Sequence, residues 1–177
     1  LRDVMDDPVL LTAEWRRKKV VPALRDPYDE IWVYGLPQVH DPLAEIDVPQ
    51  SVRRKMVYTG YLERTVPQMP PAAPLPEGIT KPFVLVTTGG GGDGEALVDW
   101  VLKAYESPMA PEIPALIVFG PFMQPEAKAE FQERVEKLKS VSAITFDAHM
   151  EALMSAASAV VAMGGYNTFC EILSFDK

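Results

Sequence analysis

The chain has 177 residues, of which 47% are hydrophobic, and a formal net charge of −8. This length allows one large globular domain or parts of two. The acidic balance argues against nucleic acid as a partner, because a broad footprint on phosphates needs basic residues. The longest apolar run, around residues 156–163, is much too short to span a bilayer. A single cysteine, Cys170, suits a reducing compartment and predicts a cytoplasmic protein.

Residues 1–66 show helix and strand patterns without a clear binding motif. Asp6-Asp7-Pro8 predicts a capped helix start, and the apolar and basic run that follows predicts a helix continuing to Leu24, with Trp15 inside. Two β-rich runs, at residues 31–35 and 55–61, predict short strands.

Two polar features of this region have a plain and a functional interpretation. The four cations of residues 16–19 would spread around a helix, which favours a solvated face; contact with an acidic partner or with membrane headgroups is the alternative. His40 lies in a turn beside Asp41-Pro42, which favours a structural role over that of a base or an acceptor contact.

Residues 67–80 change the character of the chain. Pro67, Pro70, Pro71, Pro74 and Pro76 fall within ten positions and permit neither a helix nor a central strand. The segment therefore predicts a stiff, extended linker between two α/β regions.

A buried strand within residues 81–88 then leads into the glycine-rich loop of residues 89–94 and a helix from Glu95 to about Ser107. This order opens a doubly wound sheet, with the loop at the edge where such folds bind ligands. The loop has neither the dinucleotide fingerprint nor a P-loop lysine, which makes a dehydrogenase-like domain the weakest alternative. Asp93, its only ionisable side chain, is a weak candidate for a catalytic base.

Three more strands, at residues 115–120, 141–146 and 159–163, alternate with helices. A flexible turn remains the alternative for the glycine-rich loop, and an ordinary turn with a glycine hinge for the diglycine at Gly164 and Gly165. The repetition predicts that the loops share one rim of a parallel sheet. His149 falls at this rim, beside a helix start, where its ring could donate a hydrogen bond to a phosphate or a hydroxyl; simple exposure is the alternative. It is the second weak candidate for a catalytic role.

The last strand is expected to be buried and ends at Gly164 and Gly165, and a helix begins at once at Tyr166. Glycines let a ligand approach the backbone, and the free amides of a helix start attract phosphate. The helix is predicted to bury Phe169, Ile172 and Leu173, with Cys170 as a small buried residue, and to turn three polar side chains to the other side. These are Asn167, Thr168 and Glu171. A carboxylate one turn beyond a phosphate pocket suits the two hydroxyls of a ribose.

Gly-Gly-x-x-Thr-x-x-Glu at this turn, preceded by Phe146-Asp147-Ala148-His149-Met150, resembles the donor-nucleotide site of glycosyltransferase family 28. That family includes the bacterial enzyme that adds N-acetylglucosamine to lipid-linked muramyl-pentapeptide, and the plant and animal UDP-glycosyltransferases are similar. The resemblance implies that Glu171 binds the ribose, and that the diphosphate is held by Gly164, Gly165, Asn167 and Thr168.

The same resemblance implies that Phe146, Met150 and the backbone near Asp147 contact the base. It also implies that Gly90, Gly91 and Gly92 lie between the donor phosphates and the acceptor. The chain departs from the family at Met163, where a basic residue or histidine is frequent, so the diphosphate would be less well neutralised here.

The implied fold is α/β, with a Rossmann-like parallel sheet of the GT-B type that is incomplete at both ends. Residues 1–66 would be the end of an N-terminal acceptor-side domain, residues 67–80 a proline-rich linker, and residues 81–177 the first part of a C-terminal nucleotide-sugar-binding domain.

The implied reaction moves a hexosyl unit from a nucleotide-diphosphate sugar to the hydroxyl of an unidentified acceptor. The resemblance favours a UDP-sugar as the donor. It needs no metal or cofactor, and peripheral membrane contact by the full-length protein stays open. The alternatives are a non-catalytic nucleotide-sugar-binding subunit and a UDP-sugar epimerase of the same fold.

Overall fold

The structure is a computed structural model that describes residues 1–2, 7–66, 75–76, 79–90 and 92–177. It divides into two compact units, Leu1–Leu62 and Glu63–Lys177. Most of the predicted linker, residues 67–74 and 77–78, lies outside the described residues, as does Gly91 of the glycine-rich loop.

The N-terminal unit begins with two helices where the sequence predicted one. Helix α1 (Pro8–Arg17) starts after Asp7, whose carboxylate accepts a hydrogen bond from the Val9 amide at 2.8 Å, and α2 spans Val20–Arg25. Between them Lys19 has a φ of 53°, a left-handed conformation that ends a right-handed helix. Because Pro22 has no amide hydrogen to continue the hydrogen-bond ladder, it is tolerated only in the first turn of the second helix.

Strands β1 (Ile31–Val33) and β2 (Met56–Tyr58) pair in parallel, and a short helix not anticipated from the sequence, α3 (Gln50–Arg53), precedes β2. Trp15 is buried, as predicted. It belongs to a core cluster formed by Leu11, Trp15, Leu24, Ile31, Val33, Leu43, Ile46, Val48 and Val52.

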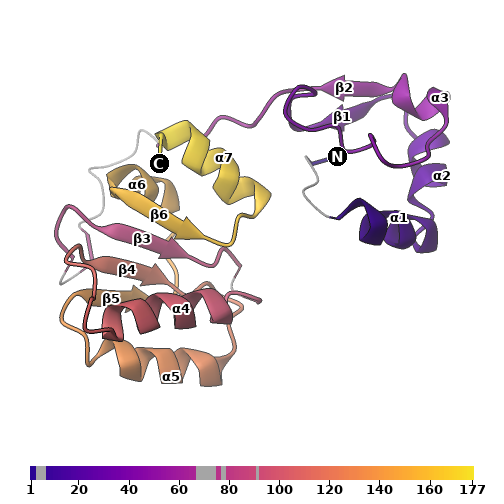
Figure 1. Cartoon of the computed structure of the whole chain (residues 1–177). Coiled ribbons are helices and arrows are strands. Elements are labelled where there is room, and N and C mark those ends of the chain that lie inside the picture. The colour runs from indigo at the N-terminus through magenta and orange to yellow at the C-terminus, as the bar shows by residue number, and fades with distance from the viewer. Residues whose placement is uncertain (3–6, 67–74, 77–78, 91) are drawn as a thin grey trace. The chain divides into compact units, whose positions relative to one another are not determined.

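The C-terminal unit is built on a four-stranded parallel sheet with the strand order β5-β4-β3-β6 (Figure 1). The strands are β3 (Val84–Thr87), β4 (Ala115–Val118), β5 (Val141–Ile144) and β6 (Ala159–Ala162). Their last residues are in register, since Thr87 pairs with both Val118 and Ala162, and Val118 pairs with Ile144. The four following loops therefore leave the sheet at one edge, and the predicted Rossmann-like α/β class is confirmed.

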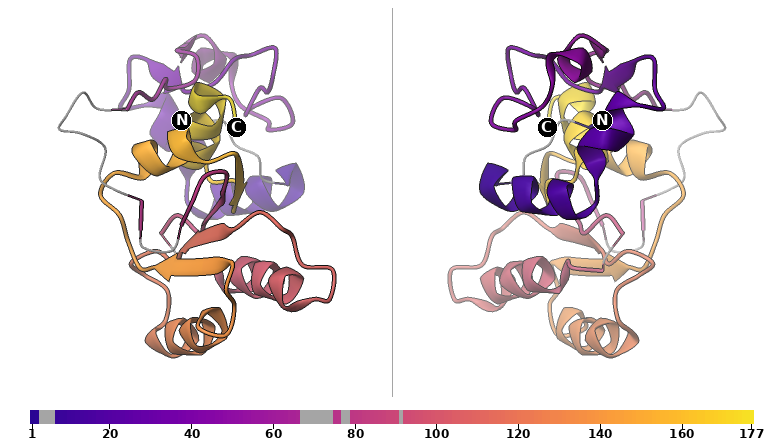
Figure 2. Two further views of the ribbon diagram at one scale, coloured as in Figure 1. Left: turned by 90° about the vertical axis from the view of Figure 1, so that its left-hand side faces the viewer. Right: turned by 90° about the vertical axis from the view of Figure 1, so that its right-hand side faces the viewer.

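Helices cover both faces of this sheet (Figures 1 and 2). Helices α4 (Glu95–Glu106) and α5 (Pro125–Val135) pack on one face, and α6 (Met150–Ala156) and α7 (Tyr166–Phe175) on the other. All four residues of β4 are buried, which is typical of a central parallel strand. The prediction that β6 is a buried strand is wrong, because β6 is the edge strand of the sheet that the structure describes and its residues are half-buried or exposed.

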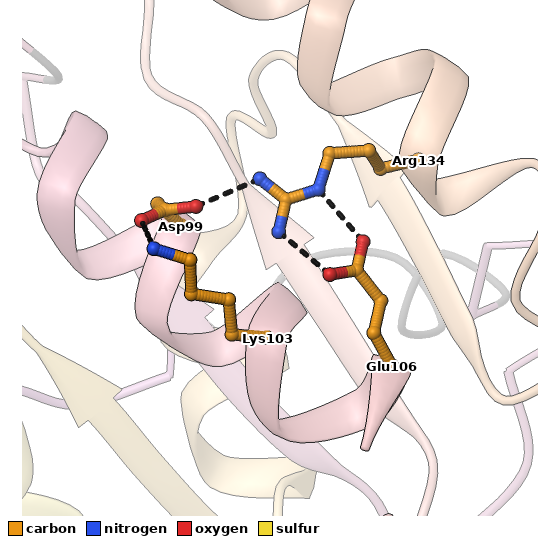
Figure 3. A network of polar contacts seen from close by, with 4 residues as sticks. All are labelled: Asp99, Lys103, Glu106 and Arg134. Carbon is orange, nitrogen blue, oxygen red and sulfur yellow. Dashed lines mark hydrogen bonds and ion pairs between the residues drawn. The ribbon is translucent and has the colours of Figure 1, made fainter.

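An ion-pair network joins α4 to α5 (Figure 3). The Arg134 guanidinium donates two hydrogen bonds to Glu106, at 2.7 and 2.9 Å, and one to Asp99 at 2.8 Å, while Lys103 pairs with Asp99 at 2.7 Å. These contacts lower the pKa of both carboxyl groups, for Asp99 through Lys103 first and Arg134 second, and for Glu106 through Arg134. The forked geometry fixes two helices on the face of the sheet opposite α7.

Candidate functional site

The predicted site residues all follow the carboxyl ends of the four strands of the C-terminal sheet. The strand register brings these ends to one edge, which is where open α/β sheets bind their ligands. The four corners differ in how closely their backbones are packed, and this difference bears on which of them has room for a ligand.

The corner between β3 and α4 is closely packed. Thr88 is buried, and its hydroxyl donates a hydrogen bond to the Phe119 carbonyl at 2.6 Å. Gly94, the residue before α4, lies so near Thr88 that a Cβ on it would overlap the Thr88 Cβ and Cγ2 atoms. Packing alone therefore accounts for this glycine.

The corner between β4 and α5 supports the glycine-rich loop. Gly120 has a φ of 82°, and a Cβ on it would lie 2.7 Å from the Gly89 carbonyl oxygen and 2.9 Å from the Gly90 carbonyl. The Phe122 amide donates a hydrogen bond to the Gly90 oxygen at 2.9 Å. These contacts hold the loop against the end of β4, a role for Gly120 and Phe122 that no sequence motif indicated.

The exposed side of this loop is open. Gly90 and Gly92 are the members of the predicted trio that the structure describes; Gly92 is exposed, and a Cβ on it would meet no atom within 4 Å. Asp93 is exposed beside it. The Phe122 ring, 72% exposed, lies along Gly90.

The corner between β5 and α6 carries the residues predicted for the base. Phe146 is 62% exposed, while Met150 is half-buried and packs against the core under α6. Asp147 accepts a hydrogen bond from the His149 amide at 2.6 Å, so its side chain shapes the turn and the helix begins only at Met150. The His149 ring is exposed, with Nδ1 3.6 Å from the Asp147 carboxylate.

The corner between β6 and α7 is open at both of its glycines. Gly164 has a φ of 73°, and a Cβ on either Gly164 or Gly165 would meet nothing within 4 Å. No side chain caps the start of α7, whose first internal hydrogen bond runs from the Phe169 amide to the Gly165 carbonyl at 2.9 Å. The preceding amides point along the helix axis toward this space, an arrangement that attracts anions.

The burial of α7 differs from the prediction. Cys170 is buried, as expected, but Phe169 and Ile172 are only half-buried, and Leu173 is 53% exposed. Ile172 and Phe175 make the contacts to the core. Because α7 lies over an edge strand and α6, it is partly covered along most of its length: its side chains are half-buried apart from the buried Cys170 and the exposed Asn167 and Leu173.

Glu171 is half-buried, while Asn167 is exposed and Thr168 half-buried. Burial raises the pKa of the Glu171 carboxyl, with Arg64 lowering it and Glu151 on α6 raising it further. Arg64 was not anticipated as part of the site, because it belongs to no motif and lies more than a hundred residues away in sequence. Only the tertiary contact places it here.

Three further observations concern metal sites, membrane spans and cavities. Among the described residues, no group of three or more His, Cys, Asp or Glu side chains has a metal-binding arrangement, and no helix is long and apolar enough to cross a membrane. A cavity of about 680 Å³ lies in the N-terminal unit, lined by residues that include Tyr28, Glu30 and Trp32. Its lining includes none of the predicted donor-site residues.

Comparison with known proteins identifies a family. The model of the glycosyltransferase family 28 C-terminal domain matches residues 83–177, which is more than half of the chain and includes the whole four-stranded sheet with its four corners. Searches of curated proteins and of solved structures found no match. The chain belongs to glycosyltransferase family 28, through the C-terminal domain of that family.

Proposed function

We propose that this glycosyltransferase moves a hexosyl unit from a UDP-sugar to an acceptor hydroxyl without a metal ion. Membership of family 28 supports glycosyl transfer in general and a nucleotide-sugar donor. In this proposal residues 81–177 bind the donor, and residues 1–66 belong to the acceptor side. The protein would work in the cytoplasm.

The observation that carries the proposal is the open corner between β6 and α7. Both glycines there have free space on the side where a Cβ would stand, and the helix start has no side-chain cap. We assign the diphosphate to this space, held by the amides of Gly164, Gly165, Asn167 and Thr168. A diphosphate carries charge that helix-end amides can stabilise without a lysine or a metal.

The position that we assign to the ribose follows from the same geometry. Glu171 lies one turn beyond Asn167 and Thr168 on α7, at a half-buried position. A carboxylate there accepts hydrogen bonds from two vicinal hydroxyls, and partial burial strengthens such bonds relative to water. We assign the base to the exposed Phe146 ring, the backbone near Asp147 and Met150.

The glycine-rich loop completes the donor site in this proposal. Gly90, Gly91 and Gly92 would lie along the transferred sugar, where the absence of side chains allows close approach. As the glycosidic bond breaks, negative charge grows on the departing UDP, and the fixed amide dipoles at α7 stabilise it. Asp93 and His149 remain candidates for the base that takes the acceptor proton, and both are exposed at this edge.

A nucleotide panel tests the donor assignment. The melting temperature of the full chain would be measured with UDP, GDP, dTDP and NAD, and UDP is expected to give the largest increase. At a ligand concentration a hundred times Kd, the stabilisation would be about 2.7 kcal/mol. A larger increase with NAD than with UDP would contradict the proposal.

Glu171→Ala tests the ribose contact. Loss of hydrogen bonds to a charged group costs about 1.5–3 kcal/mol, so affinity for UDP should fall about tenfold to more than a hundredfold, with folding retained. Leu173→Ala, at an exposed site on the same helix and outside the proposed donor site, is the matched control and should leave UDP affinity close to wild type. Unchanged UDP affinity in Glu171→Ala would contradict the ribose role.

Turnover distinguishes the activities. The protein would be incubated with UDP-sugars, with and without extracts containing acceptors, and the products separated. A glycosylated product that forms only with the extract supports transfer. Epimerised sugar without an acceptor would indicate an epimerase, and tight UDP binding without turnover a non-catalytic subunit.

A further inference from the structure

Arg64 is fixed against the helix that carries Glu171. Its backbone amide donates a hydrogen bond to the Ser174 hydroxyl at 2.8 Å, and that hydroxyl donates to the Cys170 carbonyl at 2.7 Å. Ser174 and Glu171 are three positions apart on α7, so they are neighbours on one side of the helix. The backbone contact therefore brings the Arg64 side chain to the neighbourhood of Glu171.

The Arg64 guanidinium holds an unused donor. Its Nε atom is buried and has no hydrogen-bond partner. A buried donor without a partner costs about 1–3 kcal/mol, so an acceptor that reaches this Nε–H would be favoured. Arg64 and Glu171, both described by the structure, form no direct ion pair, although the positive charge is near enough to act on the carboxyl group.

Three influences meet at the Glu171 carboxyl group. Burial favours its neutral form, and so does the like charge of Glu151 on the neighbouring helix α6; Arg64 favours the charged form. Only the ionised carboxylate has both oxygens free to accept hydrogen bonds from a ribose diol. Arg64 is thus the favourable charge facing Glu171 from the segments packed around it.

We propose that Arg64 is a positioning residue for the ribose-binding carboxylate, turning its spare Nε–H to Glu171 when nucleotide binds. This inference rests on the proposed function, because it requires Glu171 to bind the ribose. Arg64 falls within residues 1–66, assigned above to the acceptor side, but the structure groups Glu63–Lys177 in one unit, and the proposal moves this residue to the donor site.

The pH dependence of UDP binding tests the proposal. Affinity would be measured by titration calorimetry from acidic to neutral pH for the full chain and for Arg64→Met and Arg64→Lys. Wild-type affinity should fall as pH drops through the pKa of Glu171 in the free protein. Arg64→Met should move this midpoint to higher pH, and a midpoint higher by one on the pH scale would lower affinity in acid about tenfold. Arg64→Lys, which keeps the charge, should stay close to wild type.

Two further variants protect the test against a folding defect in Arg64→Met. Glu151→Gln removes the opposing charge and should move the midpoint to lower pH. Ser174→Ala removes the backbone anchor but keeps the guanidinium, and it should lower affinity by a smaller factor at every pH.

Two results would overturn the proposal, and each can be distinguished from the expected result. A uniform loss of affinity in Arg64→Met with an unshifted midpoint would overturn the proposal and leave Arg64 with a packing role. A loss for UDP but not for uridine would also overturn it, because the guanidinium would then bind phosphate. If wild type binds uridine and UDP normally, the proposed function stands in either case; if it binds no nucleotide, the proposed function fails as well.

Discussion

Two corners of the C-terminal sheet have the same sequence pattern, a strand followed by glycines and then a helix, but their glycines serve different purposes. Around the glycine-rich loop the neighbouring chain leaves little room at two positions, although Gly92 is open: a Cβ on Gly94, at the corner of β3 and α4, would overlap Thr88, and one on Gly120, at the corner of β4 and α5, would reach the carbonyls of Gly89 and Gly90. At the corner of β6 and α7 the space beside Gly164 and Gly165 is empty. A glycine in a crowded place serves the fold, whereas one that faces open space at a helix start leaves room for a ligand.

The difference predicts opposite effects for the same substitution. Alanine in the crowded corner should cost stability, and alanine in the open corner should cost nucleotide binding. Four substitutions, taken from the largest expected effect to the smallest, test this difference between residues that serve the fold and residues that serve binding.

Gly120→Ala should be the most damaging. The left-handed conformation costs a residue with a Cβ about 1–2 kcal/mol, and the overlap with Gly89 and Gly90 adds about 1–3 kcal/mol, for a total of about 2–5 kcal/mol. The free energy of unfolding would be measured by urea denaturation. A loss below about 0.5 kcal/mol would show that the glycine-rich loop moves freely and does not rest on the end of β4.

Gly94→Ala should be the next most damaging, at about 1–3 kcal/mol. The backbone at Gly94 has φ −85° and ψ 0°, which alanine adopts easily, so the cost would come only from the clash with Thr88. Urea denaturation again measures it. If stability were unchanged but UDP affinity fell, the crowded corner would be part of the binding site after all.

Gly165→Ala should show the reverse behaviour. Its φ of −61° suits alanine and the new Cβ would touch no protein atom, so stability should change by less than about 0.5 kcal/mol. The Cβ would occupy space assigned to the diphosphate, and UDP affinity should fall at least about tenfold, or about 1.4 kcal/mol. Calorimetric titration measures this, with Gly94→Ala as the matched control; equal affinity to wild type would place the diphosphate elsewhere.

Glu171→Gln should have the smallest effect on stability, and a stabilising one. Because burial raises the pKa of Glu171 above its ordinary value of 4.5, the folded protein binds a proton more readily than the unfolded chain. As the pH rises from 4.5 through the pKa of Glu171 in the folded protein, ionisation of this carboxyl group therefore lowers the free energy of unfolding of the wild-type protein. Glutamine does not ionise, so the variant avoids this loss. Melting temperatures should favour the variant at neutral pH and converge in acid; a variant less stable at neutral pH would contradict this.

The loss of binding should accompany that gain. Glutamine presents one acceptor oxygen and a donor amide, so it cannot accept both ribose hydroxyls as the carboxylate does. A residue that weakens the fold but is needed for the ligand is typical of a binding site.

Much of the fold could be predicted from local patterns. Alternating apolar strands and amphipathic helices located β3 to β6 and α4 to α7 within a few residues, because each pattern reflects burial on a sheet or a helix face. The single long helix predicted for the N-terminal region was wrong, since Pro22 and the left-handed Lys19 divide it. Leu173 was misplaced for another reason: the sequence shows an apolar stripe but not how much of it a neighbouring edge strand can cover.

The donor site also combines features that depend on local sequence with features that depend on the tertiary structure. The amino-acid sequence by itself determined the strand-to-helix corners, the diglycine before α7 and a carboxylate one turn later, because these depend on residues close together in the chain. Only the tertiary structure decided which glycines are crowded and which are open, that Gly120 supports the loop containing Gly90, and that the backbone of Arg64 binds Ser174 on the helix that carries Glu171. Free space and the charge around a carboxyl group depend on atoms brought together from distant segments, and no local pattern encodes them.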